Sequence, residues 1–180
     1  MINVPRPLIA AAAALSLFGL SSCALGSDSG GSGDGAGSPT SSDSAALENF
    51  DPCTFFKSDE LSSYGVSTQA EEFTQVSFQP GCTWNGEKMD IALQKNADET
   101  VQSLEKGGSY DSYEHINIAG RDSARMIAPG FTGQGACITV VPAGGGVALY
   151  QLTAYMRDSV ADPCGEIEKI AEQTASRLPE

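Results

Sequence analysis

The sequence has few basic residues and almost no histidine. Ten lysines and arginines and one histidine stand among 180 residues, against 23 aspartates and glutamates. The formal net charge of −13 argues against a nucleic-acid binder, which needs a basic stripe, so we expect no nucleic acid among the partners. A single histidine argues against a metal site built from several histidines. No Cys-x-x-Cys pair and no Asp-x-Asp-x-Asp-Gly loop occur either, and we expect neither a metal nor a cofactor.

A catalytic set is also missing from the sequence. No Gly-x-Ser-x-Gly elbow occurs, although serines and acidic residues are abundant. His115 lies on the polar side of a short alternating segment, and a general base needs a nucleophile and an orienting group within reach. We therefore assign no catalytic residue and expect a protein that is not an enzyme.

The one long apolar run, Pro7–Leu20, is fourteen residues long and follows Arg6. It is too short for a membrane-spanning helix, which needs about 20 residues, and its position is typical of a secretory signal. The next residues, Leu-Ser-Ser-Cys at 20–23, fit the bacterial lipobox, in which the cysteine carries a diacylglyceryl group. We predict a lipoprotein signal peptide at residues 1–22 and lipidation of Cys23. Ordinary cleavage after Gly26 is the alternative.

Lipidation of Cys23 predicts a membrane anchor. Each buried methylene of an acyl chain contributes about 0.8 kcal/mol, and two chains hold a protein stably on a bilayer. Residues 24–47 are rich in glycine and serine and lack aromatic residues, which predicts a flexible linker reaching roughly 25–30 Å. The predicted organisation is a signal peptide (1–22), a lipidated cysteine with its linker (23–47) and one folded domain (48–180). The expected location is the extracytoplasmic face of the cell membrane.

The folded domain carries three helix signals. Asp51-Pro52 and Asp162-Pro163 each place an N-cap aspartate before a proline at the first helical position. The first signal predicts a short broken helix that ends near Gly65, and the second predicts an amphipathic C-terminal helix. A third, shorter helix is expected between Asp98 and Gly108.

Between these helices the apolar residues alternate with period two, which predicts strands. Tight-turn signals such as Asn85-Gly86 join neighbouring strands and favour antiparallel pairing. The expected fold is α+β: an antiparallel sheet with the N- and C-terminal helices and the short middle helix packed on one face. The predicted strands lie within residues 73–84, 88–95, 114–118, 136–141 and 147–156.

The cysteine count is odd, and Cys23 is the cysteine left over once the other four are paired. Outside the membrane, four cysteines in a small domain are expected to form two disulfides. Four cysteines allow three pairings, and the layout favours Cys53–Cys82 with Cys137–Cys164, each joining a helix start to a strand. The alternative is Cys53–Cys164 with Cys82–Cys137.

Two loops have compositions that suit recognition. Residues 107–113 place Tyr110 and Tyr113 among glycine, serine and aspartate, and residues 129–135 carry Phe131 among glycines. These three side chains are candidates for contact surfaces. The interpretation we favour is that the rings fold back onto the edge of the core, as aromatic side chains in loops usually do. Trp84, two residues after Cys82, is expected to pack against a disulfide.

The folded domain carries an ordered set of short motifs. In chain order they are Asp51-Pro52-Cys53, Cys82-Thr83-Trp84, Ile118-Ala119-Gly120, Cys137–Val140 and Asp162-Pro163-Cys164. This set resembles the motifs of the actinobacterial lipoprotein family called domain of unknown function 3558. The likeness covers the chain from about residue 48 onward, with the lipobox and linker before it. The resemblance implies a surface-anchored, disulfide-bonded α+β domain of the cell envelope, and it supplies no catalytic or binding residue.

Taken together, these features predict a lipoprotein anchored to the membrane through Cys23. Its domain is expected to bind an envelope protein or another envelope ligand. An alternative is a carrier that holds an apolar lipid between sheet and helices, and an envelope hydrolase is the third possibility.

Overall fold

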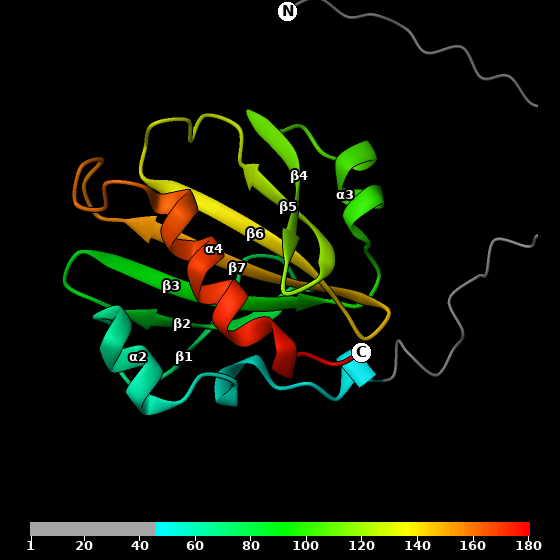
Figure 1. Ribbon diagram of the computed structural model, residues 1–180, viewed down its shortest axis with the longest axis horizontal. Coiled ribbons are helices and arrows are strands. Elements are labelled where there is room, and N and C mark those ends of the chain that lie inside the picture. Colours follow the sequence, from blue (N-terminus) through cyan, green and yellow to red (C-terminus); the bar gives the residue numbers. More distant parts are fainter. Residues whose placement is uncertain (1–45) are drawn as a thin grey trace, which may run out of the picture. The chain divides into compact units, whose positions relative to one another are not determined.

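A seven-stranded antiparallel sheet forms the framework of the protein (Figure 1). The computed structural model describes residues 46–180, and the strand order is β1-β2-β3-β7-β6-β5-β4. The strands are β1 (Glu71–Thr74), β2 (Pro80–Asn85), β3 (Met89–Asn96), β4 (Ser112–Ile118), β5 (Arg121–Ile127), β6 (Ala136–Ala143) and β7 (Gly146–Ala154). The helices are η1 (Pro52–Thr54), α2 (Ser58–Tyr64), α3 (Val101–Gly107), α4 (Pro163–Thr174) and η2 (Ala175–Arg177).

Both Asp-Pro signals begin helices, as predicted. The carboxylate of Asp51 accepts a hydrogen bond of 2.9 Å from the amide of Cys53 at the start of η1. The carboxylate of Asp162 accepts one of 2.9 Å from the amide of Gly165 at the start of α4. Each cap satisfies an amide that has no partner within its own helix.

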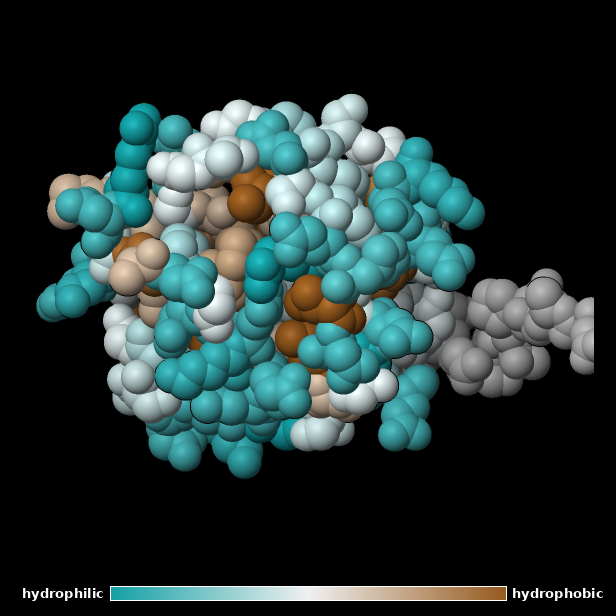
Figure 2. Space-filling view, turned by 45° about the horizontal axis from the view of Figure 1, so that its top comes forward, coloured by the Kyte–Doolittle hydropathy of each residue, from teal (hydrophilic) through white to brown (hydrophobic). Residues whose placement is uncertain are grey.

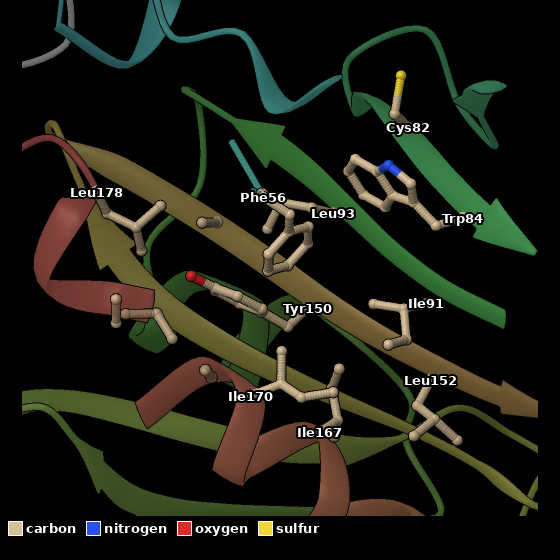
Figure 3. Close-up of a cluster of buried hydrophobic side chains, with 14 of the residues drawn as sticks. Phe56, Cys82, Trp84, Ile91, Leu93, Tyr150, Leu152, Ile167, Ile170 and Leu178 are labelled. Atoms are coloured by element: carbon tan, nitrogen blue, oxygen red, sulfur yellow. The ribbon is translucent and has the colours of Figure 1, made fainter. Parts of the chain in front are cut away.

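The main core lies between the sheet and α4. Along β7, Ala148, Tyr150 and Leu152 point to this face because alternate residues of a strand point to opposite faces. Figure 3 shows the aromatic centre of the core, where the Phe56 ring meets Trp84 edge-on with 4.9 Å between ring centroids. From α4, Ile167 and Ile170 close the layer, and both are fully buried.

The short helix α3 packs against the opposite face, so the prediction that all helices lie on one face is wrong for this helix. Val101 and Leu104 of α3 pack in a smaller cluster with Val147 and Leu149, the β7 residues that point away from α4. The physical reason is topological. The chain must travel from β3, near one edge, to β4 at the other edge, and α3 covers the sheet along that path.

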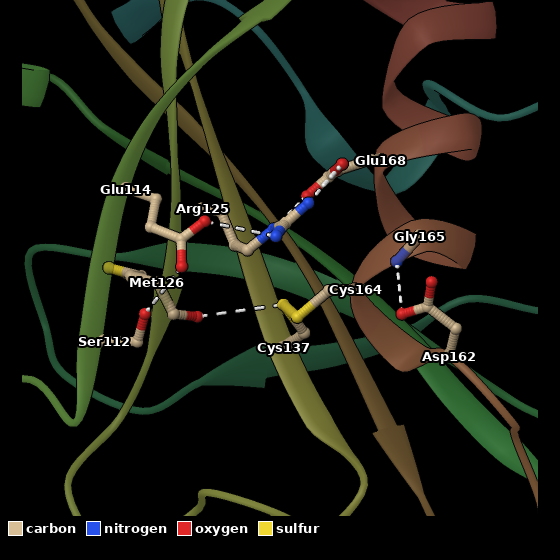
Figure 4. Close-up of polar contacts among 9 residues, drawn as sticks. All are labelled: Ser112, Glu114, Arg125, Met126, Cys137, Asp162, Cys164, Gly165 and Glu168. Atoms are coloured by element: carbon tan, nitrogen blue, oxygen red, sulfur yellow. Dashed lines mark hydrogen bonds and ion pairs between the residues drawn. A yellow bond between two sulfur atoms is a disulfide. The ribbon is translucent and has the colours of Figure 1, made fainter.

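Two disulfides join helix starts to strands, and the favoured pairing is confirmed. Cys53 of η1 bonds Cys82 of β2, and Cys137 of β6 bonds Cys164 of α4, with 5.1 Å between the Cα atoms in each pair. The second bridge is drawn in Figure 4. All four residues pack in or against the core on the α4 face, so both crosslinks stabilise the same layer. Trp84 is buried in this layer, in the same cluster as Cys82.

Two features differ from the sequence expectations. Leu47, assigned to the linker, is fully buried in the main core, so the folded domain includes it. A single leucine after a polar stretch has no periodic apolar neighbours that would reveal its burial. Strand β5 was missed as well, because Arg121, Asp122 and Arg125 obscure the alternation of its buried residues.

Candidate functional site

An open groove of about 840 Å³ lies at one end of the sheet. Four parts of the chain meet there: the first turn of α3, the β4–β5 turn, the β6–β7 turn and the C-terminal residues Ser176 and Glu180. Because the strands are antiparallel, these turns fall at the same end of the sheet even though they are far apart in sequence.

The two hairpin turns that line the groove consist of alanine and glycine residues. Ala119 and Gly120 connect β4 to β5 with φ values of 50° and 83°, which defines the tight type I′ geometry of a two-residue hairpin. Gly144 and Gly145 do the same between β6 and β7, with φ values of 49° and 79°. No long side chain projects from either turn, and main-chain groups therefore line much of the groove.

Arg121 is the cation of the groove. Its guanidinium donates hydrogen bonds to the carbonyl oxygens of Pro142 at 2.7 Å, Pro179 at 3.0 Å and Leu178 at 3.2 Å. These contacts fix the C-terminal residues beside the β6–β7 turn. Within residues 46–180, no carboxylate lies within ion-pair distance of Arg121. Carbonyl oxygens therefore make its close polar contacts, while Asp122 and Glu180 line the same groove beyond ion-pair distance.

The predicted recognition loops lie side by side, but their aromatic residues do not form one surface. The carboxylate of Asp111 joins the loops by accepting hydrogen bonds from the amides of Gly130 and Thr132 and from the Thr132 hydroxyl. The Thr132 hydroxyl and these amides hold the pKa of Asp111 below its ordinary value. Phe131, at the tip between them, is 47% exposed.

Tyr110 and Tyr113 instead turn toward α3. The hydroxyl of Tyr110 donates to the Leu104 carbonyl oxygen at 3.0 Å, and that of Tyr113 donates to the Val101 carbonyl oxygen at 2.6 Å. Both rings pack against the smaller apolar cluster, and burial raises the pKa of Tyr113 to about 12. Their geometry is that of residues that secure α3, and of the three candidates only Phe131 is exposed.

The remaining polar candidates have ordinary structural partners. His115 is exposed on β4, as predicted, and its Nε2 lies 3.2 Å from a carboxylate oxygen of Glu105 on α3. The part of the chain that the structure describes holds no group of three or more side chains that could bind a metal. In the same residues no helix is long and apolar enough to cross a membrane. Cys23, the predicted lipidation site, lies outside the described residues.

Arg121 and the groove are not among the sites that the sequence predicts. The neighbouring motif Ile118-Ala119-Gly120 contributes only to the family resemblance. The one local signal was Ala119-Gly120, because a small residue followed by glycine after an alternating segment favours a turn. The arginine directly after it would then fall at a sheet end.

The fold and groove define a disulfide-bonded α+β domain with an open, mixed polar and apolar surface site. The family model described as "Protein of unknown function (DUF3558)" matches residues 18–177, and the chain belongs to this family. Neither the curated proteins nor the solved structures contain a match.

Proposed function

We propose that this protein is a membrane-anchored extracytoplasmic lipoprotein whose domain binds an envelope component at the groove. The binding role is inferred from the position of Arg121 in the groove. This cation has no ion-pair partner in residues 46–180, and main-chain groups of the glycine-containing turns surround it. Such a site offers a few fixed polar contacts beside apolar walls such as Val101, which is the usual composition of a ligand site.

The proposed location rests on the lipobox. If Cys23 carries the anchor, Cys23→Ala moves the protein from the membrane fraction to the medium or leaves an uncleaved precursor. Fractionation and intact mass measurement distinguish these outcomes from the wild type. A Cys23→Ala protein that is still processed normally and still carries lipid would contradict the assignment.

The lipid-carrier alternative receives less support from the packing. Ile167, Ile170 and Ala171 of α4 are fully buried against the sheet, so side chains fill the layer between sheet and helix. On the face shown in Figure 2, hydrophilic residues predominate and apolar residues form small separate patches. A buried acyl chain would have to displace this packing.

The binding role is tested in intact cells with a photo-crosslinking amino acid at Ser176, an exposed residue that lines the groove. We expect a defined adduct by mass spectrometry. Gln102→Trp places an indole at an exposed lining position of α3 and should abolish the adduct. Lys106→Trp is the matched control, since it lies on the same helix outside the groove and should leave the adduct unchanged.

Two results would refute the groove as the binding site. One is an adduct yield at Ser176 no higher than that from a crosslinker at Ser62, which is exposed on α2 away from the groove. The other is an adduct that persists unchanged in Gln102→Trp.

A further inference from the structure

Within residues 46–180, the two edge strands of the sheet differ in length. The edge strand β1 has only four residues, and two of them are the adjacent glutamates Glu71 and Glu72. At the opposite edge, β4 has seven residues, and in the same part of the chain it pairs only with β5. A long edge strand without bulge or proline is a template for another strand. The β4 edge therefore needs an explanation.

The register shows which main-chain groups point outward. In a two-residue hairpin the residues that flank the turn, here Ile118 and Arg121, bond each other, and bonded pairs then alternate with non-bonded pairs. Tyr113, His115 and Asn117 occupy the non-bonded positions. Their amide and carbonyl groups therefore point away from β5. In residues 46–180 no further strand, turn or side chain pairs with these groups.

The edge is accessible along its middle. Glu114, His115 and Asn117 are exposed, and Tyr113 is half-buried, with its ring turned toward α3 and its hydroxyl on the Val101 carbonyl oxygen. Three donors and three acceptors thus lie in a row over five residues. This is the pattern that an added strand satisfies.

Carboxylates flank the edge on both faces of the sheet. Glu114 lies on the strand, Glu105 approaches His115 from α3, and Glu172 of α4 accepts a hydrogen bond of 2.6 Å from the amide of Ala119 at the strand's end. Arg125, the neighbouring cation on β5, is already paired. Its guanidinium contacts Glu114 at 3.2 Å and binds both carboxylate oxygens of Glu168 (Figure 4). The electrostatic environment of the edge is therefore acidic.

We propose that the free edge of β4 binds an extended segment of a partner protein with lysine or arginine at alternate positions. Main-chain bonds to Tyr113, His115 and Asn117 supply the pairing, and the flanking carboxylates select basic side chains. A second copy of this chain fits less well, because its net charge of −13 opposes its approach. The inference rests on the proposed binding role and names the chemistry of the partner. The β4 edge is continuous with the groove, because β4 leads directly into Ala119 and Gly120 of the groove wall.

The test uses the full chain in detergent micelles and a fluorescent heptapeptide of alternating lysine and valine. We expect saturable binding that weakens with added salt. His115→Pro removes one outward amide and obstructs the edge while leaving the β4–β5 bonds intact, so the affinity should fall at least about tenfold. His115→Thr keeps the main-chain donor and is the matched control. The same peptide with three consecutive N-methylated central amides should not bind.

Charge and position are tested separately. Glu114→Lys should weaken binding of the lysine peptide about threefold to tenfold, more than Glu114→Gln does. Bound peptide should slow hydrogen exchange at the amides of Tyr113, His115 and Asn117 and leave Glu71–Thr74 unchanged.

Specific results would overturn the proposal. One is equal affinity of the wild type and His115→Pro for the lysine peptide. Another is equally tight binding of a peptide of alternating glutamate and valine. A third is self-association of the full chain that His115→Pro abolishes but that the lysine peptide does not inhibit. If the peptide fails while Gln102→Trp still removes the cellular adduct, the binding role stands and the β4 assignment falls. Absence of any Ser176 adduct in the otherwise wild-type protein would remove the binding role.

Discussion

The two faces of the sheet are built differently. The α4 face buries Trp84 and Tyr150 and carries both disulfides, whereas the α3 face holds one seven-residue helix over a small apolar cluster. Buried amide side chains lie on the α3 side, where Gln94 and Asn96 point, whereas the buried polar residues of the α4 side include the threonines Thr139 and Thr174. The larger apolar layer on the α4 face is therefore expected to supply more of the stability than the α3 face.

The largest effect is expected from the aromatic centre of the α4 face. Trp84→Ala leaves a cavity beside Phe56 and should lower the free energy of unfolding by about 3–5 kcal/mol. Denaturant unfolding of the oxidised protein measures the loss. A loss below about 1 kcal/mol would show that the α4 face is not the main source of stability.

The disulfides should contribute almost as much, and about equally. The bridges close loops with sequence separations of 29 and 27 residues, so the chain-entropy model gives about 3–4 kcal/mol for each. Cys53→Ala with Cys82→Ala is compared with Cys137→Ala with Cys164→Ala by thermal and denaturant unfolding. A large difference between the two double variants would mean that local packing, rather than loop closure, sets their contributions.

Much of the α4 face could be predicted from local signals. Asp-Pro starts encode their own caps, and the alternation in β3 and β7 is strong because one side of each strand is almost entirely apolar. The α3 face could not be predicted in the same way. The face on which α3 packs depends on the path of the chain between β3 and β4. The short helical pattern from Val101 to Leu104 predicts a helix but does not determine that path.

The candidate site was harder to predict than the core. The groove is made by turns and termini brought together by the order of strands, and Arg121 bonds carbonyl groups more than 20 residues away in sequence. Tyr113 illustrates the converse, because a tyrosine in a polar loop suggests contact with a partner, yet its hydroxyl secures α3. Composition identifies such residues, but only tertiary structure separates their roles.

On the α3 face, Val101→Ala should cost about 1–2 kcal/mol, less than a truncation in the α4 core. Val101 lies at the first helical position and contacts a cluster with few members, so the lost packing is small. Hydrogen exchange should quicken in α3 while α4 stays protected. Equal acceleration in both helices would indicate that the two layers unfold as one cooperative unit.

A gain in stability is expected from one position beneath α4. The hydroxyl of Thr139 is buried and has no hydrogen-bond partner within the described residues. Thr139→Val replaces it with a methyl group of similar size and should raise the free energy of unfolding by about 1 kcal/mol. Thr174→Val is the matched control. It removes a buried hydroxyl that bonds the Ile170 carbonyl oxygen at 2.8 Å, and it should not stabilise the protein.

The smallest effect tests the α3 face through pH. Because burial raises the pKa of Tyr113 to about 12, the unfolded chain, in which tyrosine titrates near its ordinary value of about 10, releases this proton first. Stability contributed by Tyr113 is therefore present at neutral pH and declines as the pH rises above that ordinary value. Between about pH 9 and pH 11, wild type should lose more stability than Tyr113→Phe, by less than about 1 kcal/mol because the ring is only half-buried. Identical pH profiles would show that α3 opens before Tyr113 ionises and that the α3 face does not stay packed at high pH.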